Sequence, residues 1–320
     1  MTEHNEIIHF DQESMSHILR VLQKARARCT ASDTLVFEIL DPDQMHCSQP
    51  EGGICQGDKK RAYFSYKNWM DLAEILGCRF LTPQRVSAER VRIRLKPLKK
   101  EEQHLQNKGV PITEKYGIGS EFWRQRKFEE PTLIHDLNRC LAHCGWQEFN
   151  SILELGCNHG DFLAFALEQA SILSLGKMSY TGIDYAASAI AHAGNRFPKK
   201  QEHHFIEGDI NRLPELSPGI FDLVIGLGIF QSPSIDRQKV MRELVQNHLA
   251  ERSGIIIGLP NCRYRDGEII YGAQTKNFKE RELSLLIKDA AFIKKYLQQH
   301  RFRVMITGKY DLLIAGVRKS

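Results

Sequence analysis

The sequence lacks any run of apolar residues long enough to cross a bilayer, because a membrane-spanning helix needs about 20 of them. It also lacks the basic start and apolar stretch of a secretory signal, since positions 1–11 carry Glu3 and Glu6 instead. These two absences favour a soluble, cytoplasmic protein over a secreted or membrane-anchored one.

Closely spaced pairs of metal ligands are missing as well. A structural zinc site needs two tight pairs of cysteine or histidine ligands. Two groups come nearest without supplying such pairs, namely His46, Cys47 and Cys55, and Cys140, His143 and Cys144. The eight cysteines are scattered along a 320-residue chain that can bury a core without disulfide bonds. We therefore expect no bound metal and reduced thiols, which again favours the cytoplasm.

The chain has no strong excess of either charge: its formal net charge is +5, with 42% apolar and 26% charged residues, as in a globular protein. One basic band stands out, formed by Arg85, Arg90, Arg92, Arg94, Lys96, Lys99 and Lys100. Over 91–95 the basic residues alternate with apolar ones, so one face of a strand there is entirely basic. Such a face can contact nucleic-acid phosphates, but alternating charge is also usual on a solvated strand, and both interpretations stay open.

A chain of this length suits two domains. In the first part, apolar spacing predicts helices over 14–27 and 66–76, strands over 34–40 and 91–95, and a long polar loop over 41–60. The pattern predicts a small α+β module over 1–105, which resembles no known family and for which substrate recognition is one role. The charged stretch 96–117 predicts a linker, and we assign 106–150 to linker and lid helices.

From residue 151 onward, apolar strands alternate with amphipathic helices. The predicted strands are 151–155, 180–184, 204–207, 221–227 and 254–259, and the predicted helices are 161–175, 186–197, 236–249 and 282–299. Such alternation builds a parallel sheet with helices on both faces. A final hairpin of 303–307 and 312–317 makes the last strand antiparallel, so 151–320 is predicted to form one α/β domain.

The strongest motif lies where the strand 151–155 passes into the next helix. Gly156 and Gly160 stand four residues apart in this turn. Because glycine has no Cβ, it lets the backbone turn sharply and lie against a flat, bulky ligand. A turn with two glycines also occurs widely without a ligand, so further evidence is needed.

Two carboxylates follow at the ends of the next two strands. Asp184 ends 180–184, where a carboxylate can accept hydrogen bonds from both hydroxyls of a ribose. Asp209 follows 204–207, where a carboxylate can accept from an adenine amine while Ile210 covers the ring. Their order and their register with the strands predict one nucleoside-shaped site.

These segments resemble the class I S-adenosylmethionine-dependent methyltransferases. The likeness covers about 116–319 and rests on ELGCNHGD (154–161), GIDY (182–185), GDI (208–210), FDLVIGLG (221–228) and the final strand pair. It implies a Rossmann-like, seven-stranded sheet with an antiparallel last strand, and S-adenosyl-L-methionine as the cofactor. The cofactor-binding residues that it implies are Glu154, Gly156, Asn158, Gly160, Asp184, Tyr185, Asp209, Ile210, Gly226 and Phe230.

Within that set, the resemblance implies that Glu154 lies near the methionine ammonium and that 226–230 form the face where the methyl group is delivered. The usual middle glycine of the loop is absent, because Cys157, Asn158 and His159 fill the gap. Family members often place an aromatic, basic helix over the cofactor. The residues at the matching place are Tyr116, Phe122, Trp123 and Arg126, which can equally serve to pack their helix on the sheet.

The implied reaction is direct displacement at the sulfonium methyl, in which the protein chiefly orients the acceptor. No catalytic residue is assigned; the base candidates by position alone are His159, Tyr185 and His192. After the strand 254–259 we expect substrate contacts from Asn261, Arg263 and Tyr264. Cys262 follows an asparagine rather than a proline, which argues against a covalent nucleophile of the RNA cytosine-C5 type.

The acceptor class stays open, with a small molecule slightly favoured over RNA. A second possibility is a non-catalytic scaffold or partner subunit that binds the cofactor. A remote third is an NAD-dependent oxidoreductase, which expects Gly-x-Gly-x-x-Gly where this chain has Asn158, and which lacks the final antiparallel pair.

Overall fold

The computed structural model describes residues 7–44, 55–56, 62–98, 114, 117–124, 126–173, 178–198, 202–232, 234–265, 268–271 and 284–318. The chain divides into two compact units, one of Met1–His104 with Tyr264–Ile270 and one of Leu105–Arg263 with Tyr271–Ser320. Across these described ranges, no helix has both the length and the apolar character needed to cross a membrane.

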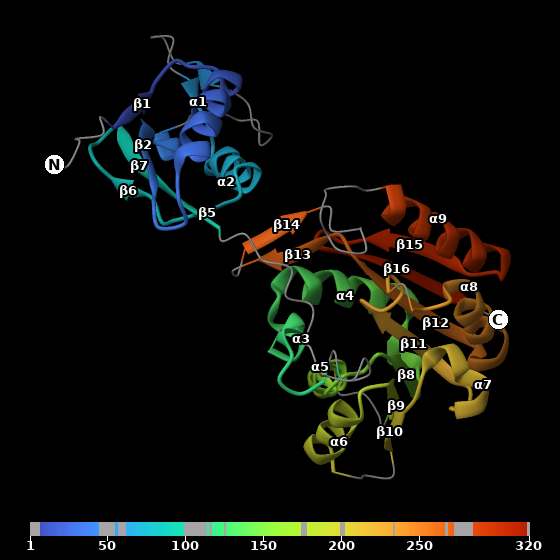
Figure 1. The fold of residues 1–320 in the computed structure, drawn as a ribbon. Coiled ribbons are helices and arrows are strands. Elements are labelled where there is room, and N and C mark those ends of the chain that lie inside the picture. Colours follow the sequence, from blue (N-terminus) through green and yellow to red (C-terminus); the bar gives the residue numbers. More distant parts are fainter. Residues whose placement is uncertain are drawn as a thin grey trace. The chain divides into compact units, whose positions relative to one another are not determined.

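The first unit is a five-stranded sheet with two helices on one face (Figure 1). The strands run in the order β1-β2-β7-β5, with β6 beside β7. Their bounds are β1 (Ile8–Phe10), β2 (Leu35–Leu40), β5 (Cys78–Phe80), β6 (Gln84–Arg85) and β7 (Arg90–Pro97). The helices are α1 (Met15–Arg28) and α2 (Tyr66–Ile75), and a separate short pair joins β3 (Cys55–Gln56) and β4 (Ala62–Tyr63).

Local sequence explains where these helices begin. Ser14 accepts a hydrogen bond from the backbone N–H of His17 at 3.3 Å, and Ser65 forms a reciprocal capping box with Asn68. The apolar faces of both helices pack on alternate residues of β2 and β7, with Trp69 at 1% exposure among them. Both predicted helices and both predicted strands of this unit are present. The unpredicted β1, β5 and β6 have two or three residues each, too few to show a period.

The second unit is built on a seven-stranded sheet in the order β10-β9-β8-β11-β12-β16-β15. The strands are β8 (Ser151–Leu155), β9 (Ser179–Asp184), β10 (His203–Glu207), β11 (Phe221–Leu227), β12 (Leu249–Pro260), β15 (Arg303–Thr307) and β16 (Asp311–Arg318). The first five in the sheet are parallel, whereas β16 is antiparallel to both β12 and β15. This confirms the predicted Rossmann-like sheet with its antiparallel last strand.

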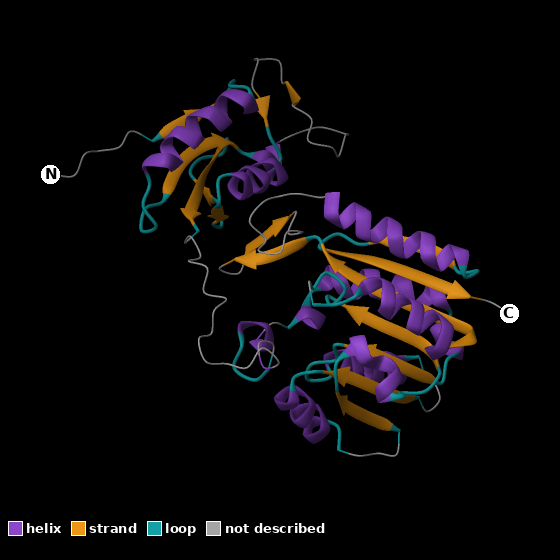
Figure 2. Cartoon of the chain, turned by 45° about the vertical axis from the view of Figure 1, so that its right-hand side comes forward, coloured by secondary structure: helices purple, strands orange, loops and turns teal. Residues whose placement is uncertain are grey.

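Helices cover both faces of this sheet (Figure 2). On one face lie α4 (Pro131–Cys144) and α5 (Asp161–Ile172), and α6 (Ala187–Arg196) packs beside β9 and β10. The other face carries α7 (Leu213–Leu216), α8 (Arg237–Glu243) and α9 (Ser284–Gln299). The short elements before α4 are α3 (Glu121–Arg124) and a 3-10 turn, η3 (Lys127–Glu129). A second 3-10 turn, η5 (Ile210–Arg212), precedes α7.

Two elements differ from the prediction. The helix predicted over 236–249 ends at Glu243 and continues as a π-turn over Leu244–His248, after which β12 begins at once. The register of β11 on β12 shifts between Phe221 and Leu223. Because of this irregularity, the apolar periodicity predicted the strand only from 254 and missed its first residues, which begin at Leu249. The substrate loop expected after this strand is short, because Cys262–Arg265 form β13, which pairs with β14 (Glu268–Tyr271).

Candidate active site

The turn between β8 and α5 lies at the carboxyl edge of the sheet, where the strand order reverses from β8 towards β9 on one side and β11 on the other. Three of its residues have positive φ angles: Gly156 at 71°, Asn158 at 44° and Gly160 at 79°. The N–H groups of Gly156 and Cys157 both donate to the carbonyl of Ile183, at 2.8 and 3.1 Å. The turn is therefore fixed to the end of β9.

The two glycines of this turn have a packing role that the sequence did not reveal. A Cβ on Gly156 would overlap Cγ2 of Ile229, and a Cβ on Gly160 would lie 2.8 Å from Cε2 of Phe197. Sequence reasoning assigned both positions to close approach of a ligand. In the structure, the space that the missing side chains leave is filled by the chain's own residues.

Asp184 links β9 to the glycine turn. Its Oδ2 accepts from the backbone N–H of Asn158 at 2.9 Å, and its Oδ1 accepts from that of Ala186 at 2.9 Å. The residue is 6% exposed. Burial raises the pKa of this carboxyl, while the backbone hydrogen bonds oppose that rise.

Glu154 lies deeper, beside Tyr180 on the neighbouring strand. The Tyr180 hydroxyl donates to Glu154 Oε2, and the two residues are 0% and 6% exposed, respectively. Burial raises the pKa of Glu154 well above its usual value, against the opposing effect of the Tyr180 hydrogen bond. A buried carboxyl with a raised pKa thus lies under the edge of the sheet.

Asp209 and Ile210 stand beside Asp184, because the N–H of Gly208 donates to the Asp184 carbonyl at 2.9 Å. Asp209 is exposed and caps η5 by accepting from the N–H of Asn211 at 2.9 Å. Ile210 is 7% exposed and packs into the core. The carboxylate therefore faces solvent, and the aliphatic side chain is held mostly inside.

At the end of β11, Gly226 and Phe230 lie together. A Cβ on Gly226 would lie 3.0 Å from Cε2 of Phe230, whose side chain is fully buried in the core. Gly228 has a positive φ of 72° and its N–H donates to the carbonyl of Gly258 on β12 at 3.0 Å. The end of β11 therefore turns next to both the β8 turn and β12.

The segment before α4 packs on this edge of the sheet, and whether it covers a cofactor stays a prediction. The Trp123 ring lies 4.6 Å from the His159 ring and 4.9 Å from the His192 ring, between centroids, in edge-on geometry. Of the other lid candidates, Arg126 is exposed, whereas Tyr116 and the side chain of Phe122 lie outside the described residues. A contact that sequence reasoning missed is Glu114, which accepts from both the hydroxyl and the N–H of Ser188 at the start of α6.

The contacts and exposure of the three candidate bases do not single out one of them for catalysis. His159 is 8% exposed, with its Nδ1 3.0 Å from Asp161 Oδ1, and Asp161 also pairs with Arg196 at 2.6 Å. His192 is exposed and Tyr185 is half-buried. These contacts occupy His159 and leave no residue singled out as a catalytic base.

Among the predicted substrate contacts, Asn261 is tied to the turn between β15 and β16. Its backbone N–H donates to the Tyr310 carbonyl at 2.8 Å, and its side-chain amide donates to the Lys309 carbonyl at 3.3 Å. The side chains of Arg263 and Tyr264 lie outside the described residues, although their backbone forms part of β13.

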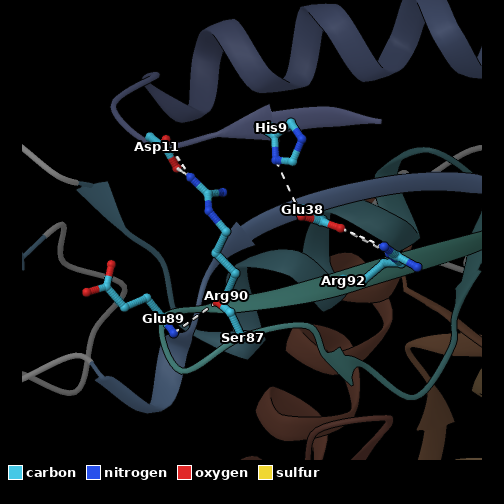
Figure 3. A network of polar contacts seen from close by, with 7 residues as sticks. All are labelled: His9, Asp11, Glu38, Ser87, Glu89, Arg90 and Arg92. Atoms are coloured by element: carbon cyan, nitrogen blue, oxygen red, sulfur yellow. Dashed lines mark hydrogen bonds and ion pairs between the residues drawn. The ribbon is translucent and has the colours of Figure 1, made fainter. Parts of the chain in front are cut away.

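The basic band of the first unit is paired with carboxylates (Figure 3). Arg92 bonds to the buried Glu38 at 2.8 Å, and Arg90 contacts Asp11 at 2.6 Å. Outside that view, Arg85 pairs with Asp41 at 2.6 Å. Lys99 and Lys100 lie outside the described residues. Three arginines of the band are thus compensated within the unit, whereas Arg94 bonds to the Thr82 carbonyl and Lys96 is exposed.

The cysteines that the structure describes are free thiols. Burial raises the pKa of Cys140 and of Cys144 to about 12, which makes both poor metal ligands. No group of three or more potential metal-binding side chains occurs within the described ranges. His46 and Cys47, and the side chains of Cys55 and Cys262, fall outside those ranges.

We compared the chain with known protein families and solved structures. Residues 153–255 match the family described as "Methyltransferase domain". No curated protein matches the chain. The solved structures that it resembles include the plantazolicin methyltransferase BpumL in complex with SAH, at 17% identity over 61% of this chain and 87% of that one, with a TM-score of 0.43.

Two further structures are similar at the same level. A SAM-dependent methyltransferase from Aquifex aeolicus shows 17% identity over 60% of this chain and 96% of its own, with a TM-score of 0.43. The magnesium protoporphyrin IX methyltransferase ChlM from Synechocystis PCC 6803, with bound SAM, shows 19% identity over 67% and 100%, with a TM-score of 0.42.

The strand order and the site at its switch point define a Rossmann-like, nucleotide-binding type of α/β domain. The family match over 153–255 lies within this sheet and assigns that segment to a methyltransferase domain, a family whose cofactor is S-adenosylmethionine.

Proposed function

We propose that the protein transfers the methyl group of S-adenosylmethionine to a small-molecule acceptor at the carboxyl edge of the seven-stranded sheet. The observation that carries this proposal is the hydrogen bond between Asp184 and the backbone of Asn158, which brings the glycine turn and the acid of β9 to one place.

The residues present fit the cofactor. The Asp184 carboxylate accepts from the backbone N–H groups of Asn158 and Ala186, and a carboxylate has about four acceptor sites, so that it can also accept from a ribose hydroxyl. Asp209, exposed next to Asp184, can accept from the adenine amine, with Ile210 behind it. Glu154 is a buried carboxyl beside the turn, and a cationic ammonium near it would favour its charged form.

The other proposed contacts are Gly156, Asn158 and Gly160 along the turn, Tyr185 after β9, and Gly226 and Phe230 at the end of β11. When bound, the cofactor supplies an activated methyl group on a positively charged sulfur. The chain orients the acceptor and excludes water. The Trp123 segment serves the second task, because it packs over His159 of the turn.

Pairing of the basic band supports a small molecule over RNA. An arginine that already bonds to a carboxylate must lose that partner before it can bind a phosphate, and the charge it offers to a polyanion is largely cancelled. This applies to Arg85, Arg90 and Arg92. The N-terminal module is assigned to substrate recognition, and Asn261, Arg263 and Tyr264 to the acceptor side of the site.

The test is a screen in which radiolabelled methyl donor and purified protein are incubated with fractionated cell extract, with and without RNase. We expect RNase-resistant label in the low-molecular-weight fraction. Label in RNA that RNase removes would overturn the small-molecule assignment and favour RNA.

Two alternatives remain for the same fold. A scaffold or partner subunit would bind the cofactor without turnover across every fraction. An NAD-dependent oxidoreductase would bind NAD in calorimetry and not S-adenosylmethionine. We expect binding of S-adenosylmethionine only, because the loop carries Asn158 where the dinucleotide motif needs glycine.

A further inference from the structure

A second group of polar atoms meets at the end of β11, on a residue that the cofactor assignment does not use. The Nζ of Lys127, from η3, lies 2.9 Å from the position that a Cβ would take on Gly228. The Nε2 of Gln231 lies 3.9 Å from the same point. Two segments that are far apart in the sequence, η3 and the turn after β11, therefore bring an ammonium and an amide close to Gly228.

Lys127 is held there by its neighbour. The ring of Phe128 lies 5.5 Å from that of Phe165 and 6.1 Å from that of Phe162, both on α5. These contacts anchor η3 on the core of the unit. They fix the backbone from which the half-buried Lys127 side chain extends towards Gly228. Its ammonium has no ion pair or hydrogen bond with any residue that the structure describes.

The orientation of Gln231 is settled by chemistry. Its Nε2 donates to the carbonyl of Gly228 at 2.6 Å, and since a carbonyl can only accept, the amide cannot be turned round. Its Oε1 is buried and has no hydrogen-bond partner among the described residues. An unpaired buried oxygen costs free energy, which a ligand that supplies an O–H or N–H would recover.

We infer that Lys127 and Gln231 form the acceptor's binding subsite, and that the acceptor is an anionic small molecule with a carboxylate next to an O–H or N–H group. Lys127 pairs with the carboxylate, and Gln231 Oε1 accepts from the neighbouring donor. This inference rests on the proposed function and names its substrate class. Both residues determine acceptor specificity.

The position separates this subsite from the cofactor residues. Asp184 and the glycine turn lie over β8 and β9, whereas the N–H of Gly228 pairs with β12 on the opposite side of β11. The positive φ of Gly228 favours glycine at this position, and a Cβ there would lie close to the Lys127 ammonium. An anion bound here would therefore lie on one side of the methyl-delivery face (226–230), and the nucleoside bound at Asp184 would lie on the other.

The test uses the full chain in complex with S-adenosylhomocysteine. Calorimetry first establishes that S-adenosylhomocysteine binds; its failure to bind would contradict the proposed function itself. The loaded protein is then titrated with salicylate, 4-hydroxybenzoate and anthranilate, and with their carboxamides, while the midpoint of thermal unfolding is followed. We expect stabilisation by at least one acid with its donor next to the carboxylate, and none by its carboxamide.

Lys127→Met removes the charge and keeps an unbranched side chain one atom shorter. Lys288→Met on α9 is the matched control on an exposed lysine. We expect Lys127→Met to weaken acid binding at least about tenfold, with S-adenosylhomocysteine affinity unchanged, and Lys288→Met to change neither. Gln231→Glu, which places a negative charge beside Lys127, should abolish acid binding as well.

Weakened S-adenosylhomocysteine binding in Lys127→Met would show a contact with the cofactor instead. Equal binding of acids and carboxamides, or binding of none of them, would likewise overturn the inference.

Discussion

The Asp184 carboxylate accepts a hydrogen bond from the backbone N–H of Asn158 at 2.9 Å, and so joins the end of β9 to the turn that follows β8. The second oxygen of the same carboxylate holds the N–H of Ala186 at the start of α6. One buried side chain thus positions both walls of the proposed ribose site before any ligand arrives.

Replacement of Asp184 by alanine should weaken cofactor binding at least tenfold, on the order of 1.5 kcal/mol, because the ribose contacts and the tie to Asn158 are both lost. Calorimetry with S-adenosylmethionine measures the effect. Asp222→Asn is the matched control, since Asp222 accepts from the N–H groups of Asn150 and Ser151 at the amino end of the strands. Unchanged affinity in a folded Asp184→Ala protein would remove Asp184 from the site.

Gly156→Ala should reduce cofactor affinity and destabilise the fold, because its φ of 71° is strained for alanine and the new Cβ overlaps Ile229. Gly145→Ala separates the two causes, since Gly145 has a φ of 72° and open space where its Cβ would be. We expect Gly145→Ala to cost only the backbone strain, about 1–2 kcal/mol in chemical unfolding. Gly156→Ala should cost more, and adding Ile229→Ala should recover part of the difference. Equal costs for the two single variants would contradict the overlap.

The Glu154 carboxyl should make the protein less stable as pH rises. Its pKa is raised in the folded state, so the folded protein binds a proton that the unfolded chain releases near 4.5, and stability falls as pH rises from that value through the raised pKa. Glu154→Gln should remove this part of the pH dependence, as measured by urea unfolding at a series of pH values. Tyr180→Phe removes the opposing hydrogen bond and should move the decline to higher pH. Identical pH profiles for the wild type and Glu154→Gln would disprove the assignment.

The contact of Glu114 with Ser188 should hold the Trp123 segment in place. Two backbone N–H groups, of Ser188 and of Ile118, depend on these two side chains for their hydrogen bonds. Ser188→Ala should therefore speed hydrogen exchange at the Ile118 amide and increase proteolysis around 117–124, while the midpoint of global unfolding changes little. Ser179→Ala, which removes a hydroxyl bonded to the Asn150 carbonyl at the far end of β9, serves as the control. The same exchange rate at Ile118 in both variants would mean that the segment is held by other contacts.

The sequence on its own determined the sheet, because its central strands are buried and read as short apolar runs, most of which alternate with helices. The positions 151–155, 221–227 and 303–307 match β8, β11 and β15 to the residue. It also located the carboxylates at 184 and 209, since parallel strands bring their carboxyl ends to one edge. The family model that matches 153–255 spans those motifs.

Only the tertiary structure decided what each of those residues touches. The glycines at 156 and 160 leave room for Ile229 and Phe197. Two arginines of β7 meet Glu38 on the neighbouring β2 and Asp11, which follows β1. The meeting of Lys127 with Gln231 has no sequence signature at all, because the two lie about a hundred positions apart and neither belongs to a motif. Such pairings depend on how loops close over the edge of the sheet, where local periodicity carries no information and packing between distant segments sets the geometry.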